Sequence, residues 1–214
     1  MWGGCQGETP VKAMTQLKTA LTALALGLAL LPAAHAQQRA AVKLPAGLKW
    51  ETMRLATFDA YPGYYAETVS PEEKQLVAKI WEKEIAANTA TTVTGKKMMS
   101  TVLMHAFEDS NFRYTFTSLN IPFQNGCEPP ANGYDVVDMY STCPMRFIAQ
   151  HKGTGRIAQK DLPSYCFLHI DEKETPVAQN HTEIAMDSNG ETVYFRIIQH
   201  GKPVPACNRA IRLK

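Results

Sequence analysis

The sequence of 214 residues lacks the short motifs that mark the common enzyme families. It contains no G-x-S-x-G or S-x-x-K signature of a serine nucleophile and no glycine-rich phosphate loop ahead of a helix. The carboxylate pairs Glu108–Asp109 and Asp171–Glu172 are direct neighbours, whereas glycoside hydrolysis needs two separated carboxylates. No catalytic residue is therefore predicted. An acid/base pair that assembles only in three dimensions, as in a small envelope hydrolase, stays the alternative.

Metal-binding patterns are absent as well. No two cysteines have the C-x₂₋₄-C spacing of a zinc site. His181-Thr-Glu183 followed by Cys207 resembles part of the zinc deaminase pattern, but Ala210 stands where the second thiolate is required. His169 and His181 could meet across neighbouring strands, yet exposed polar residues are the simpler interpretation. The sequence therefore predicts neither a metal nor a cofactor.

Charge of either sign shows little excess. The 22 lysines and arginines against 20 acidic residues give a formal net charge of +2, and they form no large cluster. Nucleic-acid binding requires clustered cations, so we expect no nucleic-acid partner. The basic tail, with Arg209 and Arg212, is interpreted as an edge strand protected by charge and not as an anion site.

The only long apolar run, Thr19–Ala34, is shorter than a membrane span of about 20 residues. Lys18 precedes it and Ala34-His35-Ala36 follows, an arrangement typical of a secretory signal peptide that begins at Met14. We therefore expect 1–36 to be an upstream extension and a signal peptide cleaved after Ala36. The remainder is expected to be periplasmic or secreted, with no stable membrane insertion. An uncleaved anchor and a core helix are the alternatives.

Cysteine is scarce, and one of the five residues would leave with the signal peptide. Four cysteines remain, an even number that predicts two disulfides in an exported chain. The short separation favours Cys127–Cys143, and elimination then gives Cys166–Cys207. A reactive or redox pair is the alternative, although no C-x-x-C supports it.

The clearest element is a helix over 71–87, in the stretch "SPEEKQLVAKIWEKEIAAN". Ser70 is the predicted N-cap, Pro71 the first helical residue and Glu73 the partner in a capping box. Apolar residues at helical spacing form one stripe: Leu76, Val77, Ile80, Trp81 and Ile85. Trp81 is interpreted as a core residue.

Alternating strands follow this helix. Phe112, Tyr114 and Phe116 alternate with polar residues, and turns at Gly153–Gly155 and Ser188–Gly190 predict hairpins. Residues 97–107 fit a helix or a strand, with a slight preference for a hairpin. The pattern predicts an α+β fold: an N-terminal amphipathic helix packed on a predominantly antiparallel β-sheet or two-sheet sandwich. The domain layout is an extended lead-in over 37–66 and a single α+β domain over 67–214.

One strand face stands out for binding. Tyr165, Phe167 and His169 share a face that is expected to pack under the helix or, alternatively, to form a partner-binding stripe. The sequence thus favours an exported, non-enzymatic protein that binds another protein, such as an envelope-assembly accessory, an inhibitor or an immunity protein. The sequence does not predict an oligomeric state.

Overall fold

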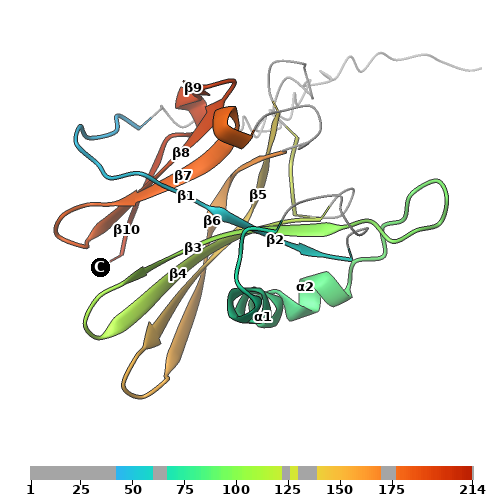
Figure 1. Ribbon diagram of the computed structural model, residues 1–214, viewed down its shortest axis with the longest axis horizontal. Coiled ribbons are helices and arrows are strands. Elements are labelled where there is room, and N and C mark those ends of the chain that lie inside the picture. The colour runs from blue at the N-terminus through green and yellow to red at the C-terminus, as the bar shows by residue number, and fades with distance from the viewer. Residues whose placement is uncertain (1–41, 60–66, 122–125, 130–138, 170–176, 214) are drawn as a thin grey trace, which may run out of the picture. The chain divides into compact units, whose positions relative to one another are not determined.

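The part of the chain that the computed structural model describes consists of two antiparallel β-sheets and two α-helices (Figure 1). The helices lie on one face of one of the sheets. The described residues are 42–59, 67–121, 126–129, 139–169 and 177–213. They belong to one compact unit, Arg39–Lys214, whereas the predicted signal peptide lies outside the described residues. No helix in these described ranges is long and apolar enough to cross a membrane.

The larger strands belong to the sheet that we call sheet B. Its strand order is β2-β3-β4-β5-β6, and each neighbouring pair is antiparallel. The bounds are β2 Arg54–Phe58, β3 Ser100–Glu108, β4 Phe112–Asn120, β5 Tyr140–His151 and β6 Ile157–Leu168. The preference for a hairpin over 97–107 is confirmed, because β3 pairs with β4. β6 runs continuously through Pro163, which proline permits at a sheet edge.

The second sheet, sheet A, has the order β1-β7-β8-β10, and β9 also pairs with β8. Its strands are β1 Glu51–Thr52, β7 His181–Met186, β8 Thr192–Gln199, β9 Lys202–Pro203 and β10 Arg209–Arg212. Short 3₁₀ helices lie at Val177–Gln179 and Pro205–Cys207. The expected edge position of the basic tail is confirmed, because β10 ends the sheet. The turn at Ser188–Gly190 joins β7 to β8, as predicted.

The chain passes from sheet A to sheet B within a few residues. β1 pairs with β7, β2 pairs with β3, and the single residue between them is Met53. Met53 is buried, and its N–H donates to the Thr182 carbonyl at 2.9 Å. This crossing helps to place the two sheets on opposite sides of one apolar core.

Both predicted disulfides are confirmed: Cys127–Cys143 and Cys166–Cys207. Cys166 lies in β6 of sheet B, while Cys207 ends the 3₁₀ helix between β9 and β10 of sheet A, so the second bond connects the two sheets. Two sheets packed face to face bring strands that are distant in the sequence close enough for this bond. Disulfides are typical of an oxidising compartment outside the cytoplasm.

The helical segment begins as the sequence predicts but is divided in two. Ser70 and Glu73 form a reciprocal capping box, and α1 covers Pro71–Ile80 while α2 covers Glu82–Ala86. Trp81 separates the two helices, with φ −112°. Its indole is buried and donates to Thr117 Oγ1 at 3.0 Å, so packing of this side chain outweighs continuity of the helix.

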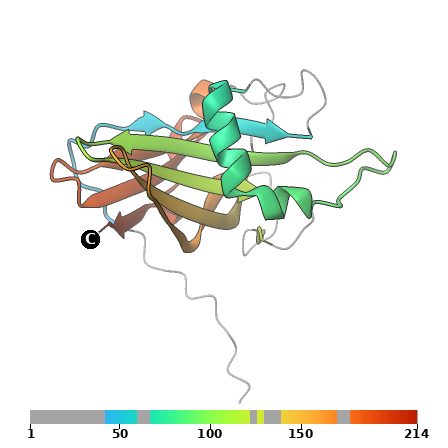
Figure 2. The same ribbon diagram turned by 90° about the horizontal axis from the view of Figure 1, so that it is seen from below.

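The helices lie across the outer face of sheet B, as Figure 2 shows. Val77 and Trp81 form a cluster with buried sheet residues, which are Ala56, Val102, Met104, Leu119 and Ile121. Ile80 packs against the same cluster. Sheet B is therefore covered by helices on its outer face and by sheet A on its inner face.

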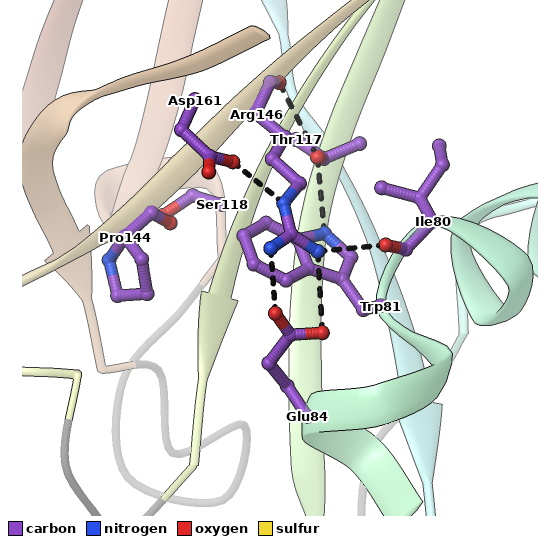
Figure 3. A network of polar contacts seen from close by, with 8 residues as sticks. All are labelled: Ile80, Trp81, Glu84, Thr117, Ser118, Pro144, Arg146 and Asp161. Carbon is purple, nitrogen blue, oxygen red and sulfur yellow. Dashed lines mark hydrogen bonds and ion pairs between the residues drawn. The ribbon is translucent and has the colours of Figure 1, made fainter. Parts of the chain in front are cut away.

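Arg146 of β5 connects α1 and α2 to sheet B (Figure 3). Its guanidinium lies 4.1 Å from the Trp81 ring centroid and donates to the Ile80 carbonyl at 2.8 Å. It also forms two hydrogen bonds to Glu84, at 2.5 and 3.2 Å, and one to Asp161, at 2.7 Å. Burial alone would raise the pKa of Glu84, but the bonds from Arg146 lower it. The outer face thus pairs its charged groups with one another.

Candidate functional site

The inner face of sheet B becomes less buried towards the closed ends of two hairpins. Along β4, Phe116 is fully buried, whereas Tyr114 and Phe112 are only partly buried. β5 repeats the change from buried Met145 to partly buried Phe147 and His151.

The same change occurs on β3, where Leu103 and His105 are buried and Phe107 is partly exposed. The closed ends of the β3–β4 and β5–β6 hairpins lie at the lower left of Figure 1, below the strands of sheet A. We call the partly exposed residues at these ends the aromatic patch: Phe107, Phe112, Tyr114, Phe147 and His151. Sheet A therefore covers only part of the inner face.

The contacts of Phe195, from β8, mark where this cover ends. Its ring packs against Phe116 at 5.6 Å and against Tyr165 at 5.2 Å between centroids. His105 lies at the buried border, 4.5 Å from the Phe107 ring, and burial lowers its pKa. On β3 and β4 the aromatic patch begins at the next inner-face pair, Phe107 and Tyr114, whereas on β5 it begins at Phe147, directly opposite Phe116.

Ring contacts hold the aromatic patch in a defined arrangement. Phe112 stacks on Tyr114 at 5.8 Å, and Tyr114 stacks on Phe147 at 6.0 Å between centroids. His151 packs edge-on against Phe112 at 5.1 Å. Such pairs prefer stacked or edge-to-face geometry at these separations. The rings are therefore positioned before any partner binds.

The turns at the patch are fixed by polar contacts. The Tyr114 hydroxyl donates to Asp109 at 3.0 Å, and burial together with this bond raises the pKa of Tyr114. Backbone N–H bonds from Phe112 and Asn111 lower the pKa of Asp109. In the other turn, Nδ1 of His151 accepts from the N–H groups of Gly153 and Thr154 at 3.1 and 3.2 Å. Both hairpin ends are thus rigid supports.

The face predicted from Tyr165, Phe167 and His169 lies elsewhere than expected. Tyr165 and Phe167 are 4% and 3% exposed and belong to the core between the two sheets. They do not pack under the helix, because their side of β6 faces sheet A. In this conformation these two side chains offer no surface to a partner. His169 follows β6, and burial lowers its pKa.

A serine and a histidine meet at the opposite end of β5. Ser141 Oγ and His169 Nε2 are 2.7 Å apart, a pair that sequence spacing did not reveal. A hydrogen bond between a serine hydroxyl and a histidine is the contact by which histidine activates a serine nucleophile. Ser141 is, however, fully buried, so its hydroxyl does not reach a substrate in this conformation.

The remaining histidine of interest, His181, has a separate set of neighbours on the outer face of sheet A. Its Nε2 lies 3.2 Å from Glu183, which also pairs with Arg196, and Arg196 lies 4.2 Å from the Trp50 ring centroid. Within the described ranges, no three His, Cys, Asp or Glu side chains lie close enough to hold a metal ion. His169 contacts Ser141, and His181 contacts Glu183.

Comparison with known proteins adds no functional information to these observations. No protein-family model, curated protein or solved structure matches this chain. The geometry of the aromatic patch is therefore the main indication of function. The sequence contained part of that signal in the alternation of Phe112, Tyr114 and Phe116, but alternation does not say where the covering sheet ends.

Proposed function

We propose that this protein works by binding another protein through the aromatic patch. The observation that carries the proposal is the loss of cover on three neighbouring strands, which leaves four large aromatic side chains partly exposed on one face. Aromatic residues are enriched in protein interfaces and account for many of the residues that dominate binding energy.

The rigidity of the patch supports this role. The rings stack on one another, and hydrogen bonds at Asp109 and His151 fix both turns. A surface that is already ordered loses little side-chain entropy on binding, so more of the contact energy appears as affinity. The turn at Gly153–Gly155 adjoins His151 and would form one margin of the interface.

We further propose that the protein acts in the periplasm or outside the cell, as an envelope-assembly accessory, an inhibitor or an immunity protein. Two disulfides and the apolar run that ends near Ala36 support this location. N-terminal sequencing of the protein from its native cell should find a chain that begins at Gln37. A chain that retains Thr15–Ala36 in the membrane fraction would contradict export with cleavage.

Site-specific photocrosslinking in the native cell tests the binding function. A photoreactive amino acid replaces Phe112 in one variant and Gln75, an exposed residue of α1 on the opposite side of sheet B, in the control. We expect one adduct of defined mass from position 112 and none from position 75. The adduct should disappear when Phe147→Ser is added. Equal adducts from both positions, or an adduct insensitive to Phe147→Ser, would refute the proposal.

The second candidate is a small envelope hydrolase, favoured by the contact between Ser141 and His169. Full burial of Ser141 counts against it. A serine-directed fluorophosphonate probe distinguishes the two functions, because a nucleophilic serine reacts with it. We expect no label at Ser141, whereas labelling that is lost in His169→Ala would favour the hydrolase.

A further inference from the structure

The aromatic patch adjoins an open sheet edge. β6 is the last strand of sheet B, and no other described strand pairs with the edge of β6 that faces away from β5. From Ile157 to Asp161 every residue is exposed, and Leu162 is partly buried. An antiparallel edge strand directs alternate N–H and C=O groups outwards, where an added strand can pair with them.

The open part of this edge has a definite end. Pro163 lacks an N–H, and Nη1 of Arg209 donates to the carbonyl groups of Pro163 and Ser164 at 2.8 and 2.5 Å. These contacts leave Ile157–Leu162 as the stretch of β6 that is available for pairing.

Cations without acidic partners accompany this stretch. Arg156 and Lys160 are exposed, and neither forms an ion pair with any residue in the described ranges. The one carboxylate on the stretch, Asp161, is occupied by Arg146 at 2.7 Å. The open edge therefore presents unbalanced positive charge, although the chain as a whole is close to neutral.

We infer that the partner contributes an acidic, extended segment that adds as a strand to Ile157–Leu162 of β6 and places apolar side chains on the aromatic patch. This inference rests on the proposed binding function and specifies the chemistry of the partner. Strand addition supplies affinity through backbone hydrogen bonds, while alternate side chains supply specificity.

Strand register shows how the edge and the patch connect. Tyr114, Ala149 and Ala158 form one cross-strand row on the inner face. The two alanines are small, so this row carries no large side chain between the Tyr114 ring and the open edge. The next row ends in Lys160, directly opposite Phe147, where a carboxylate of the partner would fit.

An apolar side chain is also exposed on the outer face of sheet B at this edge. Ile157 is 53% exposed, one of two large apolar side chains in the described ranges with such exposure. It is one residue from Ala158 and therefore points to the outer face. An added strand would cover both residues, with alternate side chains on the two faces. Neither a membrane surface nor a nucleic acid would pair with the backbone of β6.

A peptide probe tests this inference on the purified full-length protein. The probe is a capped peptide in which glutamate alternates with valine and phenylalanine. One control peptide replaces glutamate with lysine, and another places proline at alternate positions, which removes N–H donors. Binding is measured by titration calorimetry, and the site is mapped from backbone amide shifts. We expect the acidic peptide to bind and to shift Ile157–Leu162, and both controls to bind at least about tenfold more weakly.

Matched variants locate the interaction. Lys160→Glu should weaken binding of the acidic peptide by about tenfold or more, because like charges then face one another. Lys202→Glu changes an exposed lysine of β9 in sheet A and should leave binding unchanged. Equal binding of the lysine peptide, no effect of Lys160→Glu, or binding to vesicles of anionic phosphatidylglycerol in place of the peptide would overturn the inference.

The two proposals fail separately. If the photocrosslinked partner is lost in Phe147→Ser but bound equally well by Lys160→Glu, the patch binds a protein and the acidic added strand is wrong. If the partner is bound equally well by Phe147→Ser, the proposed function itself is wrong.

Discussion

The two faces of sheet B differ in how completely their side chains are covered. On the outer face, α1 and α2 bury Trp81 and Val77, and Arg146 pairs with acidic groups from both the helix and the sheet. On the inner face, sheet A buries Phe116 and Tyr165 but leaves Phe112 partly exposed.

This difference separates stability from function within one sheet. A region whose side chains are buried or paired, such as that around Trp81 and Arg146, contributes to the free energy of unfolding and has little left for a partner. A rigid aromatic surface that is only partly covered keeps apolar area for binding. Substitutions on the two faces should therefore change different properties, and the following predictions test that separation.

The largest loss of stability should come from Trp81→Ala. The change removes a buried indole, its bond to Thr117 and its contact with Arg146, and should cost about 3–5 kcal/mol. Urea unfolding measures the loss. Trp50→Ala, at a partly exposed tryptophan that precedes β1, is the control and should cost clearly less. Equal losses would show that the helices do not hold the outer face.

A pair of phenylalanines on one strand tests the boundary of the inner face. Phe116→Ala should cost about 3–5 kcal/mol, since this ring is fully buried. Phe112→Ala should cost about 1 kcal/mol or less, because solvent already reaches its ring. Thermal or urea unfolding measures both. A loss at Phe112 as large as that at Phe116 would mean that the patch is core.

The two disulfides should differ in a smaller way. Cys166–Cys207 closes a separation of 41 residues and Cys127–Cys143 one of 16. The loop-entropy relation then predicts about 0.8 kcal/mol more destabilisation when both cysteines of the longer loop become alanine. Equilibrium unfolding of the two double variants measures the difference. A larger loss of stability in the Cys127–Cys143 variant would show that the inter-sheet bond is not the more stabilising of the two.

Another small effect should be a dependence on pH at the outer face. The pKa of Glu84 in the folded protein lies below its ordinary value of 4.5, so its pairing with Arg146 stabilises the fold fully above that value. The contribution is lost as the pH falls through the lowered pKa. Because Glu84 is partly exposed, the contribution should not exceed about 1 kcal/mol. Glu84→Gln should flatten the stability profile below pH 4.5, and an unchanged profile would refute the role of this pair.

Local patterns predicted much of this fold. The capping box at Ser70, the core position of Trp81, the hairpin turns and both disulfide pairings depend on neighbouring residues or on counting, and all are present. The break of the helix occurs at Trp81, whose indole bonds to Thr117, a residue far away in the sequence.

The candidate site could not be found in this way. Parity correctly grouped Tyr165 with Phe167 but could not tell which layer would cover them. Tyr114 shares the same kind of alternation and is only partly buried. How far one sheet extends over another depends on the lengths and crossing of all the strands. The aromatic patch therefore required the structure.

Hydroxyl-radical footprinting of the purified protein, alone and in complex with its photocrosslinked partner, tests the central claim most directly. In the free protein, Phe112, Tyr114 and Phe147 should be oxidised readily while Phe116 and Phe195 stay protected. In the complex, the three aromatic patch residues should become protected with no change at the partly exposed Leu76 of α1, an aliphatic residue that hydroxyl radicals also oxidise. Aromatic patch residues that are protected in the free protein, or that remain reactive in the complex, would contradict the account.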